Sequence, residues 1–77
     1  MKIIGDKLRM ARLLSGWSVN ELAQISGISK SAICKYEFEE SEPGGDTVFI
    51  LACALKFPVK FFTVPLKDKL EVKNTFL

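Results

Sequence analysis

The chain contains no histidine and only two cysteines, so it lacks the side chains that most metal sites and acid–base catalysts use. Cys34 and Cys53 are too few for a disulfide framework, and their separation does not match metal-ligand spacing. Neither a nucleophile motif nor a glycine-rich phosphate loop is present. We therefore expect no metal, no cofactor, no small-molecule ligand and no enzymatic activity.

Long apolar runs are also missing, although 48% of the 77 residues are hydrophobic. A membrane-spanning helix needs about 20 consecutive apolar residues, and no stretch approaches that length. Near the N-terminus, Asp6, Lys7 and Arg9 interrupt the region that a signal peptide would need to be apolar. Clusters of Gly, Pro and Ser, which would indicate disorder, are few. We expect one small cytoplasmic domain without a membrane partner.

The net charge of +2 is small but unevenly distributed along the chain. Residues 1–36 carry six basic and two acidic side chains, whereas residues 37–46 carry five acidic and no basic ones. Residues 47–77 are basic again, with five lysines and two acidic residues. An anionic partner is therefore expected to meet the N-terminal half and to avoid the acidic middle.

A short helix is predicted to begin at a capping box early in residues 18–37. Ser18 stands three residues before Glu21, so each side chain can accept a backbone N–H at the helix start. Trp17 and Leu22 occupy the two staple positions around this cap. Gly27 falls where the helix must end, because the residue just past a helix end often needs a positive φ.

A second short helix is predicted over residues 30–37, directly after this turn. Ser29 precedes it and is expected to cap its N-terminus. Ile33 and Tyr36 lie three residues apart and would point into the core. The outer face would then carry Lys30, Ser31, Cys34 and Lys35.

The two helices and their turn resemble the helix-turn-helix of the lambda-repressor/Cro-like (XRE-type) DNA-binding family. The positions that carry the resemblance, at the family's relative spacing, are Ala23, Gly27, Ile33 and Glu37. The resemblance covers about residues 4–64. It implies an all-α fold, a compact bundle of five short helices in which the helix-turn-helix forms helices two and three.

The first and fourth helices are predicted from apolar spacing. Residues 3–15 would form the first helix, which Gly16 ends, and the fourth would follow Asp46 as its N-cap and run to about residue 55. The predicted inner positions are Ile4, Leu8, Ala11, Val48, Leu51, Ala52 and Leu55. Phe49 and Cys53 are expected beside them, with Cys53 in the core.

The end of the fourth helix and the start of the fifth lie close together. Lys56 stands where the resembled family usually has a helix-ending glycine, and a positive φ there would cost roughly 1 kcal/mol. Pro58 is well placed to open the fifth helix, because its missing N–H is not needed in a first turn. The side chains expected to close the core from this helix are Val59, Phe61 and Phe62.

We divide the chain into a helix-turn-helix domain, residues 1–65, and a C-terminal segment, residues 66–77. Apolar and charged residues alternate weakly in the segment, which leaves a strand, a frayed tail and a dimerisation arm as alternatives. Residues 8–16 and 57–65 are similar to those of regulators in which such a domain precedes a zinc-peptidase-like domain. No His-Glu-x-x-His motif follows here, so a stand-alone relative and the front part of a longer protein both stay open.

The resemblance also implies a structural ion pair between Arg12 and Glu37. Family members pair an Arg at this place in helix one with the Glu that closes the helix-turn-helix. Loss of one partner would cost about 3–5 kcal/mol if the pair is fully buried, because the other charge would be stranded. Two solvated charges are the alternative.

Double-stranded DNA is the partner that the resemblance implies. In such motifs the second helix enters the major groove and presents its N-terminal side chains to base edges. Lys30, Ser31 and Lys35 are the candidate base contacts, because Lys donates to guanine and Ser donates or accepts. The predicted DNA-binding set also includes Ser18, Val19, Ser29 and Cys34. Helix capping by the two flanking serines, and a solvated face for the lysines, are the alternatives.

Two features predict weak binding by a single copy. Val19 stands where the family often has a DNA-contacting Gln, and the loop over residues 38–45 contains Glu39, Glu40 and Glu42. We therefore expect a homodimer that engages two half-sites about one helical turn apart. The competing function is a protein-interaction module, or an antitoxin-like domain, that keeps the fold and binds DNA weakly.

Two candidate dimer surfaces follow from the sequence. Met10, Leu13 and Leu14 lie just off the inner face of the first helix and would form an exposed apolar patch. Alternatively, they widen the buried face and pack under the C-terminal segment. The other candidate surface is the C-terminal stretch with Phe76 and Leu77.

Overall fold

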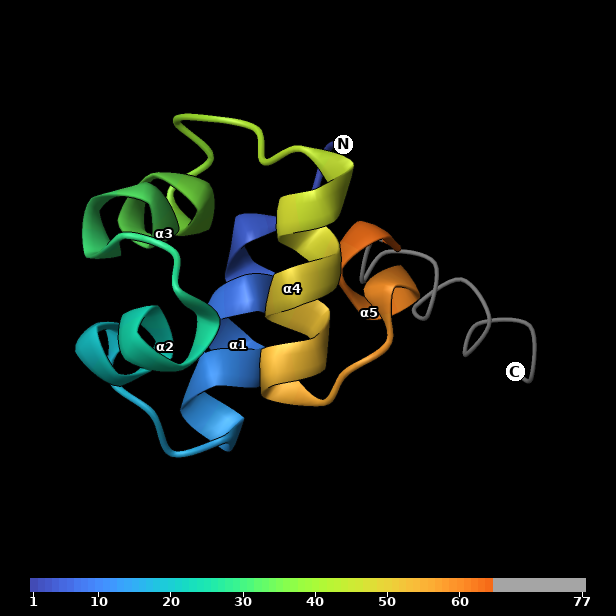
Figure 1. The fold of residues 1–77 in the computed structure, drawn as a ribbon. Helices are drawn as coiled ribbons and strands as arrows, with labels where there is room; N and C mark the ends of the chain where they lie inside the picture. Colours follow the sequence, from blue (N-terminus) through green and yellow to red (C-terminus); the bar gives the residue numbers. More distant parts are fainter. Residues whose placement is uncertain (65–77) are drawn as a thin grey trace, which may run out of the picture.

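The computed structural model describes residues 1–64, in which all five predicted helices are present (Figure 1). They are α1 (Gly5–Leu14), α2 (Val19–Ser26), α3 (Lys30–Glu37), α4 (Gly45–Leu55) and α5 (Val59–Thr63). These residues contain no strand, so the predicted all-α class is confirmed. Each helix in this part of the chain is too short or too polar to serve as a transmembrane span. The predicted tail or dimerisation arm, residues 66–77, lies outside the described residues.

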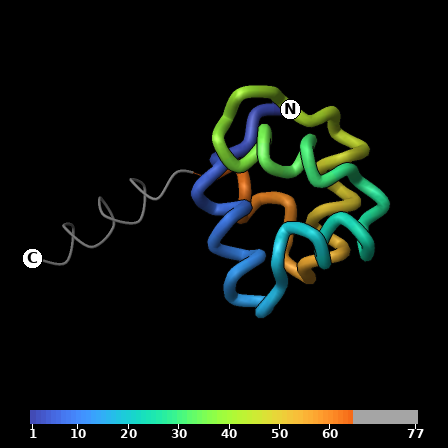
Figure 2. Tube along the Cα trace, turned by 90° about the vertical axis from the view of Figure 1, so that its left-hand side faces the viewer, coloured from blue at the N-terminus to red at the C-terminus, as the bar shows by residue number. Residues whose placement is uncertain are grey.

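The five helices enclose one core. Helix α3 contacts both α1 and α2, α4 contacts α2 and α5, and α5 also contacts α1. In Figure 1, α2 and α3 lie on one side of α4, and α5 lies on the other. Figure 2 views the molecule from the side of α2 and α3 and shows the N-terminal residues beside the loop that joins α3 to α4. The N-terminal residues are thus hydrogen-bonded to the loop between α3 and α4, and α5 adds the last helix to the core.

The core consists of apolar side chains from all five helices and from the residues before α1. Its buried members are Ile3, Leu8, Ala11, Leu22, Ile33, Val48, Leu51, Ala52, Leu55 and Phe62. The prediction differs at the start of the chain, where Ile3 is buried and Ile4 only half-buried. The reason is that α1 begins at Gly5, so Ile4 is its extended N-cap, and the Ile4 N–H donates to the Phe62 carbonyl at 2.8 Å.

Helix α4 differs from the prediction at its N-terminus and on one face. Its N-cap is Gly44 in an extended conformation, whereas Asp46 lies in the first turn, where a negative charge favours the helix dipole. Cys53 was predicted in the core and is exposed, and Phe49 is 61% exposed. Residues 47–55 include no charged side chain, so apolar spacing alone did not distinguish the inner face from the outer face.

The chain reverses direction between α4 and α5 over three residues. Lys56 ends α4 with a positive φ of 62°, and the Phe57 N–H donates to the Ala52 carbonyl at 3.0 Å. Pro58 is the N-cap of α5 rather than its first helical residue. This reversal brings Phe62 into the core, where it is 1% exposed.

Candidate nucleic-acid interface

Helices α2 and α3 and the turn between them form the helix-turn-helix unit. The Glu21 N–H donates to Ser18 Oγ at 3.1 Å and the Ser18 N–H donates to Glu21 Oε1 at 2.8 Å, so the predicted capping box is confirmed. At the other end of α2, Gly27 has a φ of 76° and its N–H donates to the Ala23 carbonyl. Ser29 then caps α3 by accepting the Ala32 N–H at 3.1 Å. Bonds within the unit therefore fix both helices that meet at the turn.

Helix α3 turns one face to the core and the opposite face to solvent. Ile33 is fully buried, and Tyr36 is half-buried and packs against the core. The outer face exposes Lys30, Ser31 and Lys35. Cys34 is half-buried, which makes it less accessible than its predicted outer position implies. The two lysines and the serine are thus the most accessible candidate side chains on α3.

The remaining candidate contacts lie at the N-terminal ends of α2 and α3. Ser18 and Ser29 are exposed, and each side-chain oxygen accepts a backbone N–H of its own helix. Capping occupies an acceptor site of each hydroxyl, and its O–H can still donate to a phosphate oxygen. Val19 is half-buried and packs against the core, so a partner can touch part of its side chain.

Arg12 joins α1 to both ends of the helix-turn-helix. Its Nε donates to Glu37 Oε2 at 2.7 Å and its Nη2 donates to Glu37 Oε1 at 3.1 Å, while Nη1 donates to the Trp17 carbonyl at 3.1 Å. The hydrogen bond to Glu37 raises the pKa of Arg12 above its usual value. Because the pKa of Arg12 is higher in the folded state than in the unfolded state, the ion pair stabilises the fold fully at any pH below the unfolded-state pKa. This stabilisation is lost only under strongly alkaline conditions, as the pH rises through the folded-state pKa.

The start of α1 lies against the end of α3, a contact that the sequence did not predict. The Gly5 N–H donates to Glu39 Oε2 at 2.9 Å. A Cβ atom on Gly5 would overlap the Glu37 carbonyl oxygen, so a side chain there requires the two helices to move apart. The sequence feature that could have indicated this close contact is a glycine in the first turn of a predicted helix. Glu39, Glu40 and Glu42 are all exposed, and the carboxylate of Glu39 is the one that this contact engages.

Two basic side chains of the N-terminal half are engaged inside the molecule. Lys7 is 5% exposed, its Nζ donates to the Val64 carbonyl at 2.5 Å, and it lies 5.0 Å from the Phe61 ring centre. Arg12 is paired with Glu37. The exposed basic side chains of residues 1–36 are Lys2, Arg9, Lys30 and Lys35. Half of this accessible positive charge therefore stands on α3.

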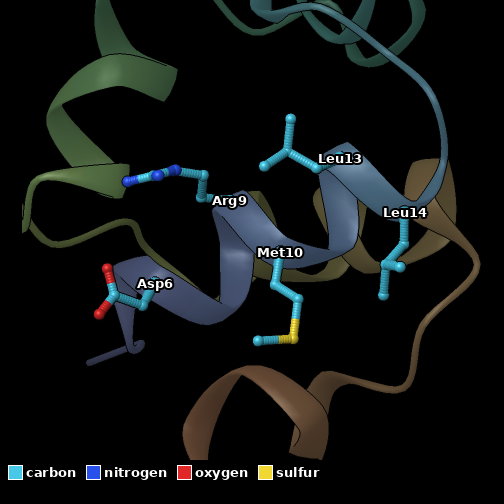
Figure 3. Close-up of a pocket in the computed structure, with 5 residues that line it drawn as sticks. All are labelled: Asp6, Arg9, Met10, Leu13 and Leu14. Atoms are coloured by element: carbon cyan, nitrogen blue, oxygen red, sulfur yellow. The ribbon is translucent and has the colours of Figure 1, made fainter.

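The apolar patch predicted on α1 is exposed in the described part of the chain (Figure 3). Met10, Leu13 and Leu14 are 42%, 57% and 70% exposed. Together with Asp6 and Arg9 they line an open depression of about 550 Å³. We call these five residues the α1 patch. The alternative, in which the three apolar side chains widen the buried face and pack under the C-terminal segment, involves residues outside those that the structure describes.

Fold and site together define a helix-turn-helix domain. The HTH_3 helix-turn-helix family model matches residues 8–62, from α1 to α5, and the chain belongs to this family. The HTH-type transcriptional regulator SutR of Escherichia coli is 31% identical over 64 residues, which are 83% of this chain and 36% of SutR. The chain spans between 20% and 36% of the length of the curated relatives that it matches.

Solved structures show the same fold. The restriction-modification controller protein C.AhdI from Aeromonas hydrophila superposes with a TM-score of 0.71 at 28% identity, over 74% of this chain and 86% of that chain. An HTH_3 family transcriptional regulator from Vibrio cholerae superposes with a TM-score of 0.72 at 30% identity, over 77% of this chain and 33% of that chain. The predicted helix-turn-helix fold is therefore confirmed by sequence and by structure.

Proposed function

We propose that this chain is the DNA-binding part of a transcriptional regulator that inserts the N-terminal half of α3 into the major groove of a specific duplex site. The observation that carries the proposal is the exposed face of α3, with Lys30, Ser31 and Lys35. The opposite face is anchored by the fully buried Ile33, so the exposed side chains are held on a rigid element. The transcriptional-regulator description of SutR supports the same role.

Each candidate residue has a distinct part in this proposal. Lys30, Ser31 and Lys35 contact base edges or adjacent phosphates, because they stand on the exposed face of α3. Ser18 and Ser29 donate to phosphate oxygens at the two helix N-termini and fix the register on the duplex. The remaining members of the set are Val19 and Cys34, whose half-buried side chains offer small apolar contacts.

A homodimer is the second part of the proposal. Four exposed basic side chains in residues 1–36 neutralise few phosphates, so one copy releases few counterions and binds weakly. Two copies on a two-fold symmetric site double the contacts and place the two α3 helices about one helical turn apart.

Selection from a pool of random duplex DNA, at a low and a high salt concentration, tests the proposal. We expect enrichment of a two-fold symmetric site whose affinity falls as salt rises. On the selected site, Lys35→Ala should cost about 1–3 kcal/mol and relax preference at one base pair if Lys35 contacts a base. A chain that is folded by circular dichroism but enriches no sequence at low salt would contradict sequence-specific binding.

One observation favours a second candidate, a protein-interaction or antitoxin-like domain with weak DNA binding. Glu40 and Glu42 are exposed in the loop that directly follows α3, where their charges repel phosphates. A complex formed through apolar surfaces would keep its affinity as salt rises, whereas the DNA complex would lose it. The selection experiment separates the two candidates, because the second one predicts that no sequence is enriched at low salt.

A further inference from the structure

An apolar surface that the sequence did not predict lies between the end of α2 and the outer face of α4. Its lining residues surround an open depression of about 340 Å³, and they are Ile25, Ser26, Phe49, Ile50, Cys53 and Ala54. We call this surface the α2–α4 patch. Phe49, Ile25 and Ile50 are 61%, 54% and 42% exposed. Large apolar side chains gathered in this way usually mark an interaction surface.

We propose that the α2–α4 patch is the surface through which two copies of this chain associate; the inference rests on the proposed function and gives it a dimer interface. None of the six lining residues is charged. In a two-fold contact a surface meets its own copy, so a net charge on it would face a like charge. A neutral apolar surface is complementary to itself, which makes a second copy the partner that fits.

The polar groups of the α2–α4 patch are already satisfied within the chain. Ser26 Oγ donates to the Leu22 carbonyl at 2.7 Å and accepts the Ile28 N–H at 3.2 Å. Cys53 is a free thiol, which behaves as a small apolar side chain. Covering the patch therefore removes apolar area from water without stranding a hydrogen-bonding group.

The α1 patch is the less suitable surface for a second copy. Asp6 and Arg9 line it, so covering it would take charged groups out of water. It also lies near the point where the chain leaves the described structure, because the Val64 carbonyl is bonded to Lys7 of α1. The α2–α4 patch is remote from that exit, since α2 and α5 lie on opposite sides of α4 (Figure 1).

The α2–α4 patch is also placed to orient the recognition helices of two copies. Ile25 lies seven residues beyond Ser18, about 10 Å along the axis of α2, so the patch leaves the N-terminal end of α2 open to DNA. Helix α2 contacts both α3 and α4. A contact made through α2 and α4 therefore fixes the direction of α3 in each copy, which two half-sites at a set spacing require.

Sedimentation equilibrium over a wide concentration range tests the inference with two matched variants. Phe49→Glu places a charge in the α2–α4 patch, and Leu14→Glu places the same charge in the α1 patch. Both positions are exposed helix positions, so both variants should keep the helical circular dichroism of the parent chain. We expect Phe49→Glu to raise the dimer dissociation constant by about tenfold or more and Leu14→Glu to leave it unchanged.

Two results would overturn the inference. One is a parent chain that stays monomeric up to the highest concentration, and the other is dissociation by Leu14→Glu but not by Phe49→Glu. DNA titrations keep this question separate from the proposed function. Phe49→Glu should bind a single half-site as the parent does and lose affinity for the double site, whereas Lys35→Ala should stay dimeric and lose affinity for both. A dimer that Phe49→Glu dissociates, but that binds no DNA, would support the interface and contradict the DNA-binding proposal.

Discussion

Among single residues, Arg12 has hydrogen bonds to two other parts of the chain. It bonds to the Trp17 carbonyl just before α2 and to both carboxylate oxygens of Glu37 at the end of α3. We predict that Arg12→Ala lowers the free energy of unfolding by about 3–5 kcal/mol, because the Glu37 side chain, 6% exposed, keeps its charge without a partner. Urea unfolding followed by circular dichroism measures this loss.

A double-mutant cycle separates the ion pair from the packing of the two side chains. Glu37→Ala should be destabilising for the same reason as Arg12→Ala, and the double variant should cost clearly less than the two single losses together. The reason is that, once one residue of the pair has been replaced, replacing the other removes a buried charge that no longer has a partner. Additive losses would show that the two charges do not depend on each other.

The backbone at Lys56 allows a stabilising substitution. Lys56 has a φ of 62°, in the left-handed region that costs a residue with a Cβ roughly 1–2 kcal/mol. Glycine avoids this strain but loses more entropy on folding, so we predict that Lys56→Gly raises the free energy of unfolding by about 0.5–1 kcal/mol. Thermal unfolding of the variant and the parent chain checks the sign.

Glu39 provides a matched control for this substitution. It has a similar φ of 58°, but its carboxylate accepts the Gly5 N–H. Glu39→Gly relieves the same strain and removes that hydrogen bond, so no gain in melting temperature is expected. A gain at position 39 equal to that at position 56 would show that the Glu39–Gly5 bond contributes nothing to stability.

At the scale of helices, the contact between α1 and α3 depends on a residue without a side chain. Ala is normally the better helix former, so Gly→Ala in a helix is expected to stabilise. Gly5→Ala should do the opposite, because its Cβ would overlap the Glu37 backbone carbonyl. Gly45, the first residue of α4, serves as the control, because a Cβ added there would meet nothing within 4 Å. We predict a lower melting temperature for Gly5→Ala and an equal or higher one for Gly45→Ala.

The helices that the sequence predicted most accurately are those whose ends carry strong local signals. The bounds of α3 and the caps at Ser18, Gly27 and Ser29 follow from side-chain chemistry within a few residues. Helix α4 lacks such signals, since its cap is Gly44 and its nine residues from 47 to 55 are all uncharged. Which side of α4 faces the core is decided by contacts with α2 and α5, and these contacts bring in residues far away in the sequence.

At the scale of the whole molecule, the number of basic side chains that a partner can meet is smaller than the number of basic residues in the sequence. Lys7 and Arg12 add to the basic total of residues 1–36, but one bonds to the Val64 carbonyl and the other to Glu37. The resemblance to relatives supplied the second of these pairings, and no local pattern indicates the first. The exposed face of α3 needed no such information, because Lys30, Ser31 and Lys35 share one helix whose buried side Ile33 identifies, whereas the proposed role of that face in DNA binding came from the resemblance. Sequence thus predicts the exposed face of one helix better than an electrostatic field to which several helices contribute.

The exposed side chains of Glu40 and Glu42, which follow α3, should lower the affinity for DNA through electrostatic repulsion of the phosphates. We predict that the double variant Glu40→Gln/Glu42→Gln binds random duplex DNA several-fold more tightly than the parent chain at low salt, because two negative charges near α3 are removed. The gain should vanish at high salt, where charges more than about 3 Å apart are screened. Fluorescence anisotropy measures both conditions.

Glu39→Gln gives the matched comparison for this prediction. Its carboxylate accepts the Gly5 N–H at the N-terminus of α1, where the helix dipole compensates part of the negative charge. Removing that charge should therefore raise DNA affinity less than removing the charge of Glu40 or Glu42. A gain that persists at high salt, or the same gain at all three positions, would mean that the loop affects binding through its conformation rather than through its charge.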